Sequence, residues 1–182
     1  MRGVKMSTWL MFAYSPISIK YGGGLVRYTI YTDGGCSGNK RDAGCPGGFG
    51  FIIIDESGNM VYESGGRVEN TTNNRMEMIA VINGLMALIT MIKQSSEVQK
   101  HSVVVCTDSQ YVACNFEEYL PEWKKNGWRK GNGQPVLNKD LWKQLNGLTP
   151  EFESFSFRWV RGHAEDAMNQ RADAIVRQHI YG

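Results

Sequence analysis

Four carboxylates lie beside apolar segments of the chain. Asp33 and Asp108 each follow a predicted strand, Glu77 precedes residues 78–92, which carry no charge, and Asp173 lies among apolar residues near the C-terminus. A lone carboxylate beside a hydrophobic core is costly unless it is paired or bound to a cation. Because ligand sites in open α/β sheets gather at strand ends, these acids are candidates to converge on one site.

Converging carboxylates repel one another, and a divalent cation relieves that repulsion. Hard oxygen ligands suit Mg²⁺, with Mn²⁺ as a substitute. Two such ions about 3.5–4 Å apart activate a water molecule and stabilise the leaving oxygen when a phosphodiester is cleaved. Taken singly, each acid has the alternative role of a helix cap or a surface charge. Spacing alone therefore indicates a metal-dependent site without proving that the acids meet.

The segments that position these acids alternate between strand and helix patterns. Strands are predicted at residues 26–32, 49–54, 60–66, 102–107 and 155–160, and helices at residues 73–93, 109–119, 138–145 and 169–180. Residues 55–59 have the composition of a hairpin turn, and the β-branched run 102–107 suits a strand covered on both faces. The order β-β-β-α-β-α-α-β-α predicts an α/β fold with a five-stranded mixed sheet flanked by helices.

Charge is distributed unevenly along the 182 residues, which suit one domain with a sizeable core. The net charge is +2, but residues 123–143 hold six basic residues against Asp140, a local balance of +5 that leaves −3 for the remainder. One basic patch on a mildly acidic body favours a polyanionic partner met at one place. The composition, 42% hydrophobic and 21% charged, excludes a disordered chain.

Aromatic residues lie within the basic patch. Tyr119 and Trp123 are four apart, so on a helix they share one face. Rings flanked by Lys and Arg are typical of a groove for a sugar–phosphate backbone, and a solvated charged face is the alternative. The candidate nucleic-acid contacts in this region are Tyr119, Trp123, Lys124, Lys125, Trp128 and Arg129.

Residues 1–26 are expected to be an N-terminal extension, with the folded domain at residues 27–182. The apolar run 9–13 is too short to span a bilayer, and no secretory signal is evident. We therefore expect an intracellular protein, cytoplasmic and not membrane-bound, with an organellar presequence or an upstream leader as alternatives for residues 1–26.

The four cysteines, Cys36, Cys45, Cys106 and Cys114, form no metal-ligand spacing and are expected to be reduced thiols. Cys106 lies in an apolar run and is interpreted as a core thiol. Cys36 and Cys45 flank a glycine-rich turn, so their pairing stays open.

Four motifs occur in a consistent order. They are Tyr-Thr-Asp-Gly-Gly at 31–35, Thr-Asn-Asn-Arg-Met-Glu at 72–77, Thr-Asp-Ser-Gln-Tyr-Val at 107–112, and Gly-His-Ala at 162–164 followed by Asn-Gln-Arg-Ala-Asp at 169–173. Together they resemble type 1 ribonuclease H, the endonuclease that cuts RNA in an RNA–DNA hybrid, over roughly residues 27–181. The segment 135–142 resembles that of the cellular form, which carries a basic protrusion.

The resemblance implies a ribonuclease H-like fold and assigns roles to single residues. Asp33, Glu77, Asp108 and Asp173 would bind the metal ions, and His163 would assist proton movement or product release. Hydrolysis of the RNA strand would leave a 5′-phosphate and a 3′-hydroxyl.

Substrate recognition is also implied by the resemblance. Asn39, Asn73, Asn74 and Gln110 would contact the RNA strand, whose 2′-hydroxyls distinguish it from DNA. Thr72 would contact a phosphate of the DNA strand. The chain departs from the family pattern at Gln170, where glutamate is common, at residues 165–168, and in the longer turn at residues 40–46.

The expected partner is an RNA–DNA hybrid, bound by a monomer. Two alternatives from other functional classes stay open. A nuclease of the integrase or resolvase type would share the fold, but it would lack the motif at 72–77 and the aromatic basic segment. A hybrid-binding protein without catalysis would normally have lost one of the acids.

Overall fold

A five-stranded sheet organises the residues that the computed structural model describes, which are 24–38, 44–95, 100–162 and 166–182. Its strands are β1 (Leu25–Cys36), β2 (Cys45–Ile54), β3 (Met60–Thr71), β4 (Lys100–Thr107) and β5 (Ser154–Trp159). They lie side by side in the order β3-β2-β1-β4-β5. The β1–β2 and β2–β3 pairs are antiparallel, whereas β1–β4 and β4–β5 are parallel. The mixed sheet expected from the sequence is therefore confirmed.

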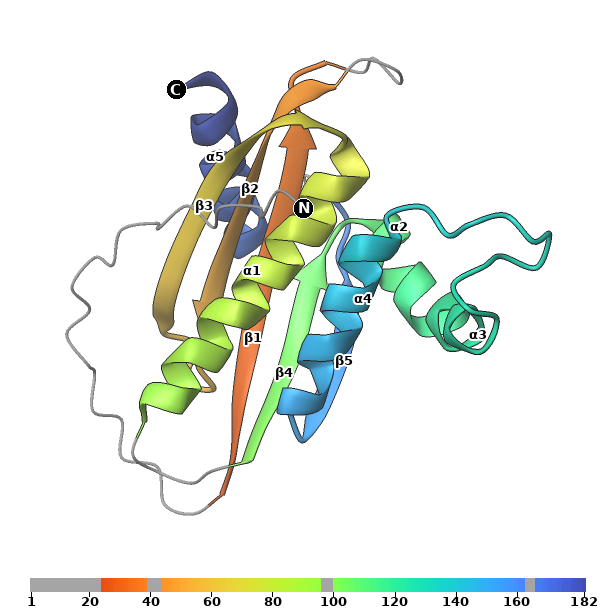
Figure 1. The fold of residues 1–182 in the computed structure, drawn as a ribbon. Helices are drawn as coiled ribbons and strands as arrows, with labels where there is room; N and C mark the ends of the chain where they lie inside the picture. The colour runs from red at the N-terminus through yellow and green to blue at the C-terminus, as the bar shows by residue number, and fades with distance from the viewer. Residues whose placement is uncertain (1–23, 39–43, 96–99, 163–165) are drawn as a thin grey trace.

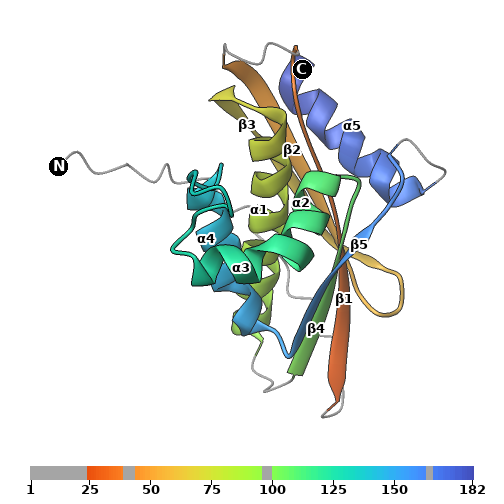
Figure 2. The same ribbon diagram turned by 90° about the vertical axis from the view of Figure 1, so that its right-hand side faces the viewer.

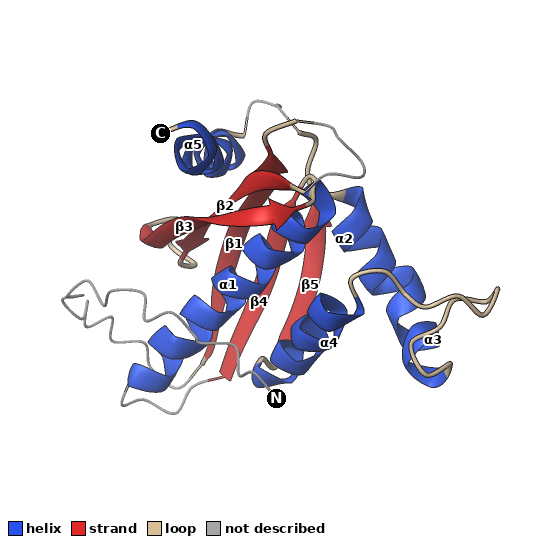
Figure 3. Cartoon of the chain, turned by 45° about the horizontal axis from the view of Figure 1, so that its top comes forward, coloured by secondary structure: helices blue, strands red, loops and turns tan. Residues whose placement is uncertain are grey.

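Helices cover the two faces of the sheet unequally (Figures 1 and 2). The helical elements are α1 (Asn73–Gln94), α2 (Gln110–Cys114), the π-helical turn η1 (Asn115–Tyr119), α3 (Leu120–Lys125), α4 (Lys139–Leu148), the 3₁₀ turn η2 (Thr149–Glu151) and α5 (Ala167–Tyr181). Figure 3 shows α1, α2 and α4 on one side of the sheet and α5 alone on the other. The sheet thus brings α1 and α5 close to β1 from opposite faces.

The main core lies between α1 and the sheet. Alternate residues of β1, β2 and β4 face α1, and the buried face of α1 packs on them. The fully buried members include Ile30, Ile53, Leu85, Leu88 and Val105. By length and hydropathy α1 would also pass as a membrane-crossing helix, but half of its most apolar window is buried inside the protein. That burial is what a core helix requires.

The strands around the first motif are longer than the sequence indicates. β1 does not end before Asp33 but continues to Cys36, because residues 34–36 pair with residues 47–49 of β2. The glycines there suggested a turn, yet they permit close packing of the helices. A Cβ on Gly34 would lie 2.3 Å from the carbonyl carbon of Met76 in α1. Glycine is therefore needed to bring β1 against the start of α1.

The segment between β4 and α4 differs from the single predicted helix at 109–119. Helical residues continue without a gap from Gln110 to Lys125, as α2, η1 and α3, so the helix extends past the predicted end at Tyr119. Pro121 lies in the first turn of α3, directly after the π-helical turn. The π-helical turn shifts the helix register just before this point. Trp123 in α3 and Tyr111 in α2 therefore lie on opposite sides of this register shift.

Candidate active site

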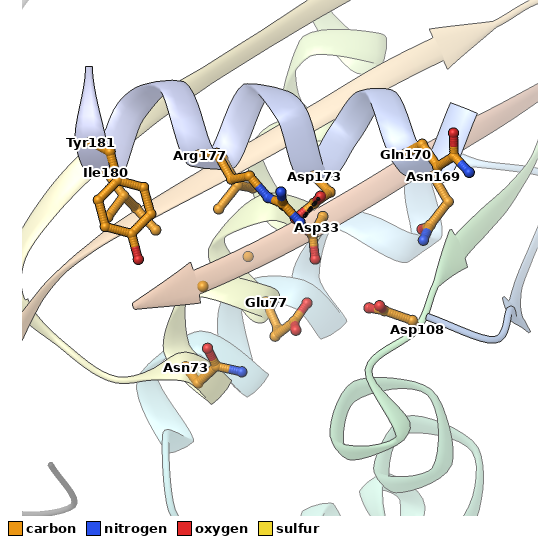
Figure 4. A pocket seen from close by; sticks show the side chains of 13 residues that line it. Asp33, Asn73, Glu77, Asp108, Asn169, Gln170, Asp173, Arg177, Ile180 and Tyr181 are labelled. Carbon is orange, nitrogen blue, oxygen red and sulfur yellow. Dashed lines mark hydrogen bonds and ion pairs between the residues drawn. The ribbon is translucent and has the colours of Figure 1, made fainter. Parts of the chain in front are cut away.

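Strand pairing brings two of the four predicted acids together. Thr32 of β1 is paired with Thr107 of the parallel strand β4, so the next residues, Asp33 and Asp108, are neighbours at the same edge. Glu77 reaches the same point from the opening turns of α1. One carboxylate oxygen from each of these three residues lies within 4.8 Å of the other two. Figure 4 shows the three side chains pointing toward a common space.

The start of α1 is defined by local hydrogen bonding. Thr72 is the N-cap in extended conformation, and its side-chain oxygen accepts a hydrogen bond from the Arg75 amide at 3.4 Å. The backbone of Glu77 lies against Gly34, where an added Cβ would be 2.4 Å from the Glu77 nitrogen. The Thr72 cap and the Gly34 contact together determine where Glu77 lies along β1.

Glu77 is under electrostatic stress in this arrangement. Only 7% of the residue is exposed. Burial raises the pKa of Glu77 well above its usual value, the charges of Asp33 and Asp108 raise it further, and the Gly34 amide opposes the shift. One carboxylate oxygen, Oε2, is buried without a hydrogen-bond partner. A divalent cation would satisfy that oxygen and offset the repulsion, so the residues present fit a Mg²⁺ or Mn²⁺ ion.

Asp173 faces the same site without joining the three-acid cluster. A pocket of about 310 Å³ is lined by Asp33, Glu77 and Asp108 and, across from them, by Asp173. The Asp173 carboxylate is held by Arg177 one helical turn later, with contacts of 2.8 Å to Nη2 and 3.2 Å to Nε. The structure therefore brings the fourth predicted ligand to the pocket wall, where it forms an ion pair with Arg177 (Figure 4).

Asn169 is a pocket residue for which no role was predicted. Its side chain is buried at the first turn of α5, lines the pocket, and has its Oδ1 without a hydrogen-bond partner. An amide oxygen is a suitable ligand for a hard cation or for a water bound to one. Its place in the motif that also contains Asp173 was the available signal.

The predicted substrate contacts beside the acid motifs are exposed where they are described. Thr72, Asn73 and Asn74 are exposed at the start of α1, and Asn73 also lines the pocket. Gln110 is exposed at the first position of α2, two residues after Asp108. The remaining predicted residues of the site, Asn39 and His163, lie outside the described residues.

One predicted contact in the basic segment, residues 119–130, is wrong. Trp123 is only 7% exposed and packs edge-on against Trp142 with ring centroids 5.6 Å apart. It is thus a core residue and not a surface contact. Tyr119, 46% exposed, stacks on it at 6.1 Å and presents the aromatic surface instead. The sequence placed both rings on one face, but it could not show that Trp142 covers the second ring.

The other candidates in the basic segment remain available at the surface. Lys124, Lys125 and Arg129 are exposed, and Trp128 is half-buried with a positive φ of 67°. The Lys143 ammonium lies 5.8 Å from the centre of the Trp128 ring, a cation–π contact. Several positively charged side chains therefore lie in the same segment as two accessible rings, those of Tyr119 and Trp128.

A polar junction ties the start of α1 to the start of α4, which follows the basic segment. Arg75 donates to both carboxylate oxygens of Asp140, at 3.1 and 2.8 Å, and to Asn138 Oδ1 at 3.4 Å. The amide of Asn138 donates in turn to the hydroxyl of Tyr111 at 3.0 Å. The residues beside Glu77 and the basic segment are thus fixed relative to each other.

Comparisons with known proteins agree on one family. The family model described as RNase H matches residues 26–181. The chain is 43% identical over 154 residues to Ribonuclease H of Cyanothece sp., covering 84% of this chain and 88% of that protein. It is 41% identical over 149 residues to Ribonuclease HI of Neisseria meningitidis serogroup B, covering 82% and 92% respectively.

Solved structures share the fold. LC9-RNase H1, a type 1 RNase H with the type 2 active-site motif, matches with a TM-score of 0.70 and 28% identity, over 88% of this chain and 74% of that one. LC11-RNase H1, solved in complex with an RNA/DNA hybrid, matches with a TM-score of 0.59 and 25% identity, over 84% and 96%.

Proposed function

Because the chain belongs to the ribonuclease H family, we propose that it hydrolyses the RNA strand of RNA–DNA hybrids by two-metal-ion catalysis, leaving 5′-phosphate and 3′-hydroxyl ends. The observation that carries the proposal is the three-acid cluster, whose carboxylate oxygens lie within 4.8 Å of one another around a buried, unpartnered oxygen of Glu77. Such a cluster is unfavourable in a protein that binds no cation there.

Each acid has a defined part in this proposal. Asp33 and Asp108, each directly after the last β1–β4 residue pair, and Glu77 from the start of α1 would hold the cations. Divalent ions bound there would activate the attacking water and neutralise the charge on the leaving oxygen. Asp173 completes the set when its carboxylate turns from Arg177 toward the pocket. His163 moves a proton to or from the reacting groups, as the family resemblance implies.

The hybrid lies across the start of α1 in the proposed complex. Asn73, Asn74 and Gln110, together with Asn39, donate to and accept from the RNA strand, while Thr72 contacts a DNA phosphate. The basic segment receives the continuing sugar–phosphate backbone, through Tyr119, Lys124, Lys125, Trp128 and Arg129. The relative solved with an RNA/DNA hybrid supports this choice of substrate.

Cleavage of a labelled hybrid in Mg²⁺ and in Mn²⁺ tests the proposal. The unchanged protein should cut the RNA strand, and Asp33→Asn should cut at least about a thousandfold more slowly, because it loses charge needed to hold the cation. Glu56→Gln, a change of an exposed turn residue, is the matched control and should cut normally.

Three results would contradict the proposal. Equal cutting by the unchanged protein and Asp33→Asn would exclude the carboxylate mechanism. Equal cutting of duplex DNA would indicate an integrase- or resolvase-type nuclease. Tight binding of the hybrid without turnover would indicate a binding protein.

A further inference from the structure

Two thiols lie together at the end of the β1–β2 pair, next to the start of α1. Cys36 ends β1, and Cys45 begins β2. Side chains alternate along a strand, so Cys36 faces the same side as Gly34 and Cys45 the same side as Gly47. A Cβ on either glycine would meet Met76 of α1. Both thiols therefore project to the α1 side of the sheet.

The register of the β1–β2 pair brings the two thiols near each other. Cys36 lies opposite Gly47, so Cys45 is two residues away along β2 and on the same face. Cys45 Sγ donates to the carbonyl oxygen of Thr71 at 3.6 Å. The strand ends that carry the thiols are held together by the amide of Ser37, which donates to the carbonyl oxygen of Pro46 at 3.0 Å. The two residues are thus diagonal neighbours across the pair, and both are half-buried.

We propose that Cys36 and Cys45 form a reversible disulfide, and that this disulfide weakens binding of the hybrid at the start of α1. The first half of the proposal concerns a covalent modification site and is independent of the enzyme's activity. The second half rests on the proposed function, because it is read out through the hybrid.

The oxidant is a small-molecule disulfide of the glutathione type. Burial, with the hydrogen bond to Cys45, raises the pKa of the Cys36 thiol to about 12 and disfavours its thiolate. Cys45 therefore attacks first, forming a mixed disulfide and releasing one small thiolate. The Cys36 sulfur, losing its proton to solvent, then attacks the Cys45 sulfur and releases the second. The protein loses two electrons and two protons, and the small disulfide becomes two thiols.

The coupling to substrate passes through Thr71. Oxidation removes the Cys45 thiol proton, so the Thr71 carbonyl loses that donor, and the distance between the two sulfurs must shorten to about 2.05 Å. Thr71 directly precedes Thr72, the N-cap of α1 and the proposed phosphate contact. A displaced Thr72 weakens binding, while the contact of Gly34 with the Glu77 backbone keeps Glu77 beside Asp33. We expect KM for the hybrid to rise about tenfold or more, with kcat little changed, the loss expected for one hydrogen bond to a charged group.

The experiment treats the full chain, carrying Cys114→Ser to remove the exposed thiol, with oxidised glutathione in excess. Peptide mapping and thiol titration measure the bond, and initial rates on a labelled hybrid measure KM and kcat. We expect a Cys36–Cys45 peptide, loss of two thiols, a raised KM, and full recovery with a reductant. Cys36→Ser and Cys45→Ser should keep the reduced protein's rates and show no change of KM on oxidation.

Each other outcome has a definite meaning. Two free thiols at these positions after oxidation, or persistent mixed disulfides, would overturn the disulfide. A Cys36–Cys45 bond with unchanged KM would overturn the coupling to substrate. Absence of hybrid cleavage by the reduced protein would overturn the proposed function, while the peptide map would still decide whether the disulfide forms.

Discussion

Replacing Glu77 by Gln should stabilise the metal-free protein at neutral pH. Each pair of unit charges 4.8 Å apart repels by about 3.5 kcal/mol at an effective dielectric constant of about 20. Burial first, and then the charges of Asp33 and Asp108, raise the pKa of Glu77, so the protein avoids part of this repulsion by keeping a proton on that carboxyl. The buried carboxyl is therefore a source of instability whenever no cation is bound.

The pH dependence of stability follows from the upward shift of the Glu77 pKa. Below the unfolded-state pKa, near 4.5, the carboxyl is protonated in both states, so its raised pKa does not change the free energy of unfolding. As pH rises from there to the folded pKa, the free energy of unfolding falls by up to about 1.4 kcal/mol per pH unit. At pH 7 the Glu77→Gln protein should be more stable by about 2 kcal/mol, or about 4–8 °C in Tm. At pH 4 the two proteins should agree within about 0.5 kcal/mol.

Thermal and urea unfolding in the presence of a chelator, at pH 4 and pH 7, measure this difference. Glu56→Gln, which removes an exposed acid, should change stability by less than about 0.5 kcal/mol at either pH. Added Mg²⁺ should stabilise the unchanged protein and have a smaller effect on Glu77→Gln. A Glu77→Gln protein that is equally destabilised at both pH values would refute the electrostatic reasoning.

Two further substitutions test how the site is held. Gly34→Ala should cost about 3 kcal/mol or more in urea unfolding, because its Cβ would meet the α1 backbone at 2.3 Å, whereas Gly147→Ala, at an open position in α4, should be neutral or slightly stabilising. Arg75→Ala should cost no more than about 1 kcal/mol of stability, because the Arg75–Asp140 ion pair is partly exposed. In a double-mutant cycle, Asp140→Ala should destabilise the Arg75→Ala protein little further. If the two effects were fully additive, the pair would contribute nothing to stability.

Most of the fold could be predicted from local patterns. Alternation in β1, the β-branched run of β4 and the uncharged length of α1 each indicate one element, and their order predicts the sheet. The extension of β1 through Gly34 to Cys36, and of β2 back through Gly47 to Cys45, could not be predicted, because glycine is also the usual turn residue. Only the packing of α1 on β1 shows why glycine is required there.

The site was predictable in its members more than in its geometry. The resemblance assigned four acids, and the structure groups Asp33, Glu77 and Asp108 while Arg177 holds Asp173. An arginine one helical turn after an acid was visible in the sequence, but its competition for that acid was not. Burial of Trp123 was likewise hidden, since it depends on Trp142 from a later helix.

The parallel pairing of β1 with β4 has a consequence for how the protein becomes active. Strands β1, β2 and β3 are consecutive and joined as hairpins, so they can form early from local contacts. The β1–β4 pair must close over all of β2, β3 and α1, which is entropically expensive and slow. Asp33 and Asp108 become neighbours only at that step. A partly folded chain therefore lacks the proposed catalytic centre, and recovery of cleavage during refolding would time the β1–β4 pairing directly.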